Sequence, residues 1–204
     1  MEFVELAKSR RSAINFQSDV KITVSELQEI FEIVKTHPSS YNLQTTHYYV
    51  ATSEEKKAQV KAASFNQHKT LSASATIIVC GDREGYKKAP DLYESMKLLG
   101  IIDECEYKET IETIKNLYEN NPTLIEEDNI RNACLSAMLF MLAAKDKGWD
   151  TCPMHVKNVD LIKNIYNIPE NHEPVLMITI GKSDEKIRPR GYRKPIGEFV
   201  HFVD

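Results

Sequence analysis

Two short, continuous apolar runs, each closed by a glycine, constrain the fold of this 204-residue chain more than any other feature. They occupy residues 76–81 and 174–181. A strand that is covered on both faces is apolar at successive positions rather than at alternate ones, so both runs predict buried strands. A third run, residues 47–52, is rich in residues of high β propensity and predicts another strand.

Segments of helical periodicity separate these strands. Thr23 and Glu26 form a capping-box pattern, and apolar residues follow at helical spacing until Pro38 ends the helix. Residues 129–147 carry a broad apolar face and are followed by Gly148, so we expect a deeply buried helix that is also suited to an interface. Further helices are predicted at residues 2–9, 54–63 and 158–166.

The order of these segments points to the fold class. Helices and strands alternate, but the strands are too few and the connections too uneven for a repeating βαβ array. The pattern predicts an α+β or three-layer fold with a mixed sheet, in a single domain spanning residues 1–204. The charged residues from about 91 to 120 predict a helical excursion from the core. Residues 198–203 alternate like an edge or exchanged strand.

Composition excludes several classes of partner. The net charge is −4, and 26 Lys and Arg are interspersed with 30 Asp and Glu, so a nucleic-acid-binding surface is not expected. The first residues resemble no signal peptide, and no apolar run approaches about 20 residues, so we expect a soluble, cytoplasmic protein without a membrane partner. Four widely spaced cysteines form no C-x-x-C pair, which predicts buried or incidental thiols.

The common catalytic motifs are missing from the sequence. There is no G-x-G-x-x-G, no P-loop and no G-x-S-x-G, and the six histidines never stand at a spacing typical of zinc sites. Each histidine is therefore predicted to be a surface or hydrogen-bonding residue, and no metal is expected. Arg, Lys, Ser, Asn and Gln cluster in loops without a nucleophile–base pair. Such a chain would bind an anionic cofactor that performs the chemistry.

Four segments, in their order along the chain, resemble the nitroreductase family of flavoproteins. The first segment, after the N-terminal helix, is Arg10-Arg11-Ser12. The second, Pro38-Ser39-Ser40-Tyr41-Asn42-Leu43-Gln44, resembles the family's P-S-S-x-N-x-Q, and the third, just before the first apolar strand, is Asn66-Gln67-His68-Lys69. The fourth resembles L-A-A-x-x-x-G-[aromatic]-x-[ST]-x-P and runs from Leu142 through Gly148-Trp149 to Thr151-Cys152-Pro153-Met154-His155.

The resemblance implies a three-layer α/β/α fold with a central mixed, mainly antiparallel sheet, and a homodimer with FMN between its subunits. It implies that the first segment holds the FMN phosphate and ribityl chain, and that the second reaches the flavin held mainly by the partner. The third would lie at the pyrimidine edge of the flavin and the fourth near its N5 atom, while two basic residues of the tail complete the phosphate site. The implied residues are Arg10, Arg11 and Ser12; Ser39, Ser40, Asn42 and Gln44; Asn66 and Lys69; Pro153, Met154 and His155; and Arg190 and Arg193.

The same resemblance implies the activity and the roles of two larger segments. NADH or NADPH would deliver hydride to the flavin, which would pass the electrons to nitroaromatics, quinones or other flat, electron-poor acceptors in a ping-pong cycle. No side chain needs to act as acid or base. The 91–120 excursion would cover the pocket mouth, and the extension at about 188–204 would reach the partner subunit.

This chain departs from the family pattern at two places. Thr45-Thr46-His47 replaces the usual proline and aromatic residue, and Ile14 stands where many relatives carry a basic residue, so Lys69 would supply the positive charge at the pyrimidine edge alone. Two alternatives stay open. The chain could be an FMN carrier or sensor with little turnover, or a structural or partner-binding α+β protein that binds no flavin.

Overall fold

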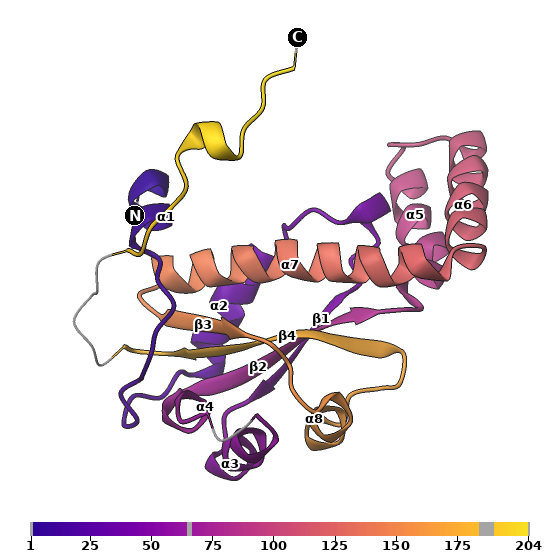
Figure 1. Ribbon diagram of the computed structural model, residues 1–204. Coiled ribbons are helices and arrows are strands. Elements are labelled where there is room, and N and C mark those ends of the chain that lie inside the picture. The colour runs from indigo at the N-terminus through magenta and orange to yellow at the C-terminus, as the bar shows by residue number, and fades with distance from the viewer. Residues whose placement is uncertain (1, 65–66, 184–189, 204) are drawn as a thin grey trace.

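The core of the fold is one antiparallel sheet. The computed structural model describes residues 2–64, 67–183 and 190–203 (Figure 1). Its strands pair in the order β1-β2-β4-β3. Their bounds are Thr46–Ala51 for β1, Ala75–Asp82 for β2, Asp150–Met154 for β3 and His172–Gly181 for β4. Each neighbouring pair is antiparallel, and the parallel pairing among the described residues is an isolated bridge between Ser12 and Thr151.

Helices cover both faces of this sheet, which confirms the three-layer architecture (Figure 1). Every residue of β2 is buried, and its side chains alternate between two cores because successive residues of a strand face opposite sides. Ile77 and Val79 pack with α2 and α7, whereas Ile78 and Cys80 pack with α3 and α8. These helices span Val24–Val34 (α2), Pro122–Asp146 (α7), Glu54–Ala63 (α3) and Val159–Tyr166 (α8).

The charged excursion forms two helices, as its periodicity predicts. Helices α5 (Ala89–Leu98) and α6 (Glu104–Glu119) pack against each other beside the first half of α7 and away from the sheet (Figure 1). Ala89, Ile114 and Tyr118 join Leu43 in a separate small core. Helix α1 (Phe3–Ser9) lies at the other end of α7.

Three local expectations are corrected by the structure. Helix α7 begins at Pro122 and not near residue 129, because Asn121 caps it and a proline is favourable in the first helical turn. Strand β3 was not predicted, since it contains Pro153; it lies at the sheet edge, where a strand tolerates proline. Lys69 opens the short helix α4 (Lys69–Ser72) instead of lying in a loop.

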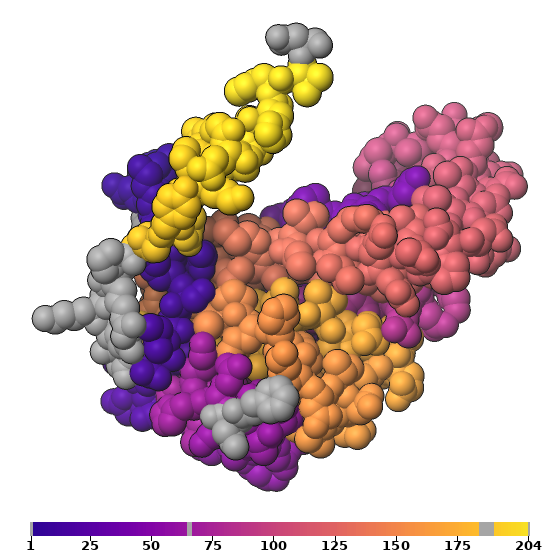
Figure 2. Space-filling model, viewed as in Figure 1, coloured from indigo at the N-terminus to yellow at the C-terminus, as the bar shows by residue number. Residues whose placement is uncertain are grey.

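The C-terminal tail differs from the edge strand that its alternation suggested. A short 3₁₀ turn, η3 (Ile196–Glu198), is its regular element, and residues 199–203 belong to no strand of this chain. The tail extends away from the body of the molecule (Figure 2). The edge-strand alternative is therefore wrong for the single chain, and an exchanged strand stays a prediction that requires a second chain. None of the described helices has the length and apolar character needed to cross a membrane.

Candidate functional site

The loop that follows α1 is attached to the outer edge of β3. The backbone N–H of Ala13 donates to the carbonyl of Thr151 over 3.0 Å, beside the Ser12–Thr151 bridge. Phe16 packs directly on Gly181, where an added Cβ would lie 2.7 Å from the Phe16 ring. The predicted phosphate-binding loop is thereby held against the edge of the sheet.

Arg190 returns from the far end of the chain to this loop. Its Nη2 donates to the carbonyl of Lys8 over 2.9 Å and to that of Arg10 over 3.1 Å, at the C-terminal end of α1. Arg11 Nη1 also donates to the Lys8 carbonyl, over 2.7 Å. Residues that the sequence separates by almost the whole chain therefore lie together.

Several arginines bring positive charge to this place. Among the described residues, no carboxylate forms an ion pair with Arg10, Arg11, Arg190 or Arg193. Loss of hydration, and then the positive charges of three neighbouring arginines, lower the pKa of Arg190 below its ordinary value. Arg11 Nε is buried without a hydrogen-bond partner. Guanidinium groups without an ion-pair partner among the described residues are suited to a phosphate group.

Lys69 contacts a side chain of β3. Its Nζ is 3.3 Å from Sγ of Cys152, the residue that precedes the predicted Pro153-Met154-His155 segment. Cys152 belongs to a small buried cluster with Ala13 from the arginine loop, and Met154 packs against that cluster. The arginine loop, Lys69 and the end of β3 consequently converge on one region.

Helix α4, which carries Lys69, is held by a buried lysine. Lys57 Nζ donates to the carbonyl of Ala73 over 2.8 Å and to that of Leu71 over 3.2 Å, and its positive charge is paired with Glu54 at 2.9 Å. Sequence reasoning missed Lys57 because a lysine on a charged helix normally faces water. It also missed Cys152 as a contact of Lys69, since the two are brought together only by the sheet.

The Ser39–Gln44 loop has an unusual backbone. Tyr41, Asn42 and Gln44 have φ angles of 50°, 52° and 51°, a left-handed conformation that is rare outside glycine. The Ser40 N–H donates to Oδ1 of Asn132 over 3.1 Å, which ties the loop to the middle of α7. Backbone conformations of this kind are frequent at functional sites.

This loop and the arginine cluster do not meet within one chain. The arginine loop lies at the C-terminal end of α7, beneath α1, whereas Asn132 is about 20 Å back along the helix axis at 1.5 Å per residue (Figure 1). Of the remaining predicted residues, His155 is exposed just after β3, and Arg193 donates to the neighbouring carbonyls of Gly191 and Tyr192. Asn66 lies outside the described residues.

Comparisons with known proteins agree with this arrangement. The model of the nitroreductase family matches residues 7–182. A protein of Bacillus subtilis (strain 168), provisionally named NAD(P)H nitroreductase MhqN, is 47% identical over 204 residues that cover 99% of each chain. The crystal structure of the Bacillus subtilis protein ydfN, provisionally described as a nitroreductase, has a TM-score of 0.95 and 45% identity and covers 99% of each chain.

A further solved structure was determined with a bound flavin. It is a provisionally identified nitroreductase from Exiguobacterium sibiricum 255-15 in complex with FMN, with a TM-score of 0.90 and 29% identity, covering 100% of this chain and 98% of the other. The family model and the full-length relative together account for nearly the whole sequence. The chain belongs to the nitroreductase family.

Proposed function

We propose that this chain is an FMN-dependent oxidoreductase that takes hydride from NADH or NADPH and passes electrons to nitroaromatic, quinone or similar electron-poor acceptors by a ping-pong mechanism. The observation that carries the proposal is the arginine cluster, which has no ion-pair partner among the described residues and lies on a loop whose Ala13 packs with Cys152, the contact of Lys69. The Bacillus subtilis relative MhqN is named as an NAD(P)H nitroreductase, and one related structure, described as a nitroreductase, holds FMN.

The arginine cluster would hold the FMN phosphate. Arg10, Arg11 and Arg190 would provide charge-assisted hydrogen bonds, with Ser12 and Arg193 completing the set. Each bond of this kind contributes roughly 1.5–3 kcal/mol. Arg11 would reach the phosphate through its guanidinium group, whose Nη1 now donates to the carbonyl of Lys8 over 2.7 Å.

Lys69 and the end of β3 would surround the reactive ring. Bound FMN would supply a two-electron carrier that accepts hydride at N5. Lys69, whose ammonium group is positioned by Cys152, would place positive charge at the pyrimidine edge, where reduction builds negative charge. The backbone of Pro153, Met154 and His155 would face N5, and Asn66 would contribute to the pyrimidine edge.

The site would be completed by a second copy of the chain. Helix α7 exposes Ile130, Cys134, Leu135 and Met138, an apolar stripe that faces away from its own core. The Ser39–Gln44 loop lies too far from the arginine cluster of its own chain to share a flavin with it, and a homodimer removes this difficulty. In that dimer Ser39, Ser40, Asn42 and Gln44 would contact the partner's flavin.

The C-terminal tail supports the same arrangement. It leaves the body of the chain and exposes Phe199, Phe202 and Val203, which are 59%, 88% and 91% exposed (Figure 2). These apolar side chains would be covered if the tail reached the partner subunit. The pair of helices α5 and α6 would cover the pocket mouth.

The first test is the visible absorption spectrum of the purified protein with added FMN, recorded anaerobically before and after NADH and then NADPH. We expect the spectrum of a bound flavin that bleaches with at least one donor, and steady-state rates with a quinone that give the parallel double-reciprocal lines of a ping-pong cycle. Flavin that binds but stays oxidised would instead make the protein a carrier or sensor. Failure to bind flavin would contradict the proposal altogether.

A further inference from the structure

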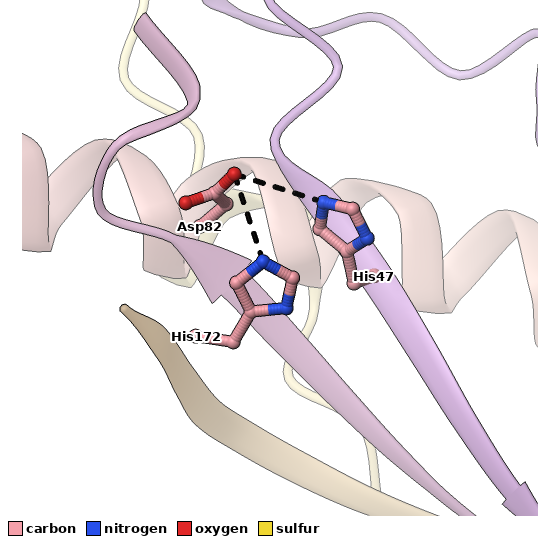
Figure 3. A group of neighbouring side chains, drawn as sticks. All are labelled: His47, Asp82 and His172. Carbon is pink, nitrogen blue, oxygen red and sulfur yellow. Dashed lines mark ion pairs between the residues drawn. The ribbon is translucent and has the colours of Figure 1, made fainter. Parts of the chain in front are cut away.

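Two histidines and an aspartate meet at the end of the sheet that lies away from the arginine cluster (Figure 3). His47 stands near the start of β1, Asp82 at the end of β2 and His172 at the start of β4. Asp82 and His172 are direct register partners, and His47 pairs with Cys80, two residues before Asp82. The positions of all three are therefore fixed by three adjacent strands.

The distances between these groups do not correspond to hydrogen bonds. Oδ2 of Asp82 is 3.9 Å from Nε2 of His47 and 3.6 Å from Nε2 of His172. Hydrogen bonds between nitrogen and oxygen measure about 2.7–3.2 Å. One ligand atom from each of the three side chains lies within 4.8 Å of the other two. Tetrahedral zinc with bonds of about 2.0–2.1 Å separates its ligands by about 3.3 Å, so small side-chain rotations would close the cluster around an ion.

Asp82 and His172 are the two buried residues of the cluster, and their side-chain atoms that point away from it are already hydrogen-bonded. Oδ1 of Asp82 accepts from the Glu84 N–H over 2.9 Å and from Asn171 Nδ2 over 2.7 Å, which leaves Oδ2 facing the histidines. The hydroxyl of Tyr49 lies 2.6 Å from Nδ1 of His172, which leaves Nε2 facing Asp82. Bonds of this kind orient the ligands of protein metal sites.

We propose that His47, Asp82 and His172 form a binding site for a divalent transition-metal cation, for which Zn²⁺ is the natural probe. Two imidazole nitrogens and one carboxylate oxygen suit this class of ion. The side chain of His47 is 38% exposed, so a water molecule can reach the remaining coordination position. The inference does not depend on the flavin chemistry proposed above.

Lys88 is the group that competes with such an ion. Its Nζ lies 3.0 Å from Asp82 Oδ2, and its side chain is 59% exposed, so it can swing into solvent when a cation binds. The other charged groups nearby are engaged elsewhere: Arg83 pairs with Glu173, and Glu84 pairs with Lys87. Removing Lys88 should therefore increase the affinity for the metal.

The site would also brace a loop of functional interest. The backbone N–H of Asp82 donates to the carbonyl of Thr45 over 2.8 Å, directly after the Ser39–Gln44 loop. A bound cation would join the end of β2 to the start of β1 and restrict that loop. Its role would be structural and separate from hydride transfer.

The test is Zn²⁺ binding to the purified chain, measured by competition with a chromophoric chelator. The protein carries Cys105→Ser and Cys134→Ser to remove its two exposed thiols. We expect one Zn²⁺ per chain with a micromolar or lower Kd, at least a tenfold loss of affinity in His47→Gln, and about a tenfold loss in Tyr49→Phe. Lys88→Met should bind several-fold more tightly, a gain that misfolding cannot produce. His201→Gln, in the exposed tail, is the control and should leave the affinity unchanged.

A crystal soaked in Zn²⁺ provides an independent measurement. An anomalous difference peak between the three side chains would support the site. The proposal is overturned if no peak appears there, or if the affinity is unchanged by both His47→Gln and Lys88→Met.

Discussion

At the scale of single residues, Arg190 connects the two ends of the chain at the proposed phosphate site. Arg190→Ala removes one phosphate donor and the hydrogen bonds to the carbonyls of Lys8 and Arg10. We expect the Kd for FMN to rise about 10- to 150-fold, corresponding to the 1.5–3 kcal/mol of a charge-assisted bond. Quenching of flavin fluorescence measures this constant. Lys35→Ala, which removes an exposed positive charge at the end of α2, should bind FMN like the wild type; equal affinities in all three proteins would remove Arg190 from the site.

Lys57 is the residue whose burial is hardest to explain without the tertiary structure. It is 1% exposed and supplies hydrogen bonds to the carbonyls of Leu71 and Ala73. Lys57→Met keeps most of the apolar stem but leaves those carbonyls unpaired, so we expect the free energy of unfolding to fall by about 3 kcal/mol. Urea denaturation gives this value. Lys61→Met on the same helix should cost less than about 0.5 kcal/mol, and similar losses in both variants would show that the buried bonds contribute little.

At the scale of elements, the structure confirms the capping box that the sequence predicts at the start of α2. Thr23 Oγ1 accepts from the Glu26 N–H, and the Glu26 carboxylate accepts from the Thr23 N–H over 2.9 Å. Thr23→Ala should destabilise the protein by about 1 kcal/mol at pH 7, measured by urea denaturation. Ser25→Ala, exposed on the same helix, is the matched control.

The capping box of α2 also predicts how the stability of the protein changes at low pH. Hydrogen bonds from the backbone and then the side chain of Thr23 lower the pKa of Glu26. The stability gained in this way is present above the unfolded pKa of a glutamate, about 4.3, and is lost as the pH falls through the lower folded value. The difference between wild type and Thr23→Ala should therefore shrink when the urea experiment is repeated below about pH 4. A difference that stays constant would show that the bond between the Thr23 hydroxyl and the Glu26 carboxylate contributes nothing, since Thr23→Ala keeps the backbone N–H that also donates to Glu26.

Elements were predictable where a local signal had one meaning. The capping box, the apolar run of β2 and Gly148 after α7 each correspond to one backbone geometry, and the structure confirms all three. Pro122 and Pro153 were each compatible with two different local structures. Pro122 could end one helix or begin the next, so the start of α7 could not be predicted from sequence alone. Pro153 is excluded from a central strand but tolerated in an edge strand, so β3 could be recognised only once its place in the sheet was known.

At the scale of the whole molecule, the proposed dimer requires the exposed stripe on α7. The wild type should have a mass of about 47 kDa in sedimentation or light scattering, twice the 23.4 kDa of the chain. Leu135→Glu, at a position 50% exposed, should shift the protein toward the monomer and weaken FMN binding, because a charge would be buried between the subunits. Leu161→Glu, at a position 41% exposed on α8, should change neither property. A monomeric wild type that binds FMN fully would contradict the shared site.

The sequence by itself determined the local geometry and the identity of the family. The periods of strand and helix are set by the backbone of a few consecutive residues, and the family motifs are short, so β2, β4, α2 and the arginine loop could be recognised without coordinates. The tertiary structure alone decided which of these segments are neighbours. The contact of Arg190 with Arg10, the approach of Lys69 to Cys152 and the meeting of His47, Asp82 and His172 all depend on strand order and register. Such contacts are long-range because burial of the two apolar faces of the sheet, and not any local preference, selects the order in which strands pair.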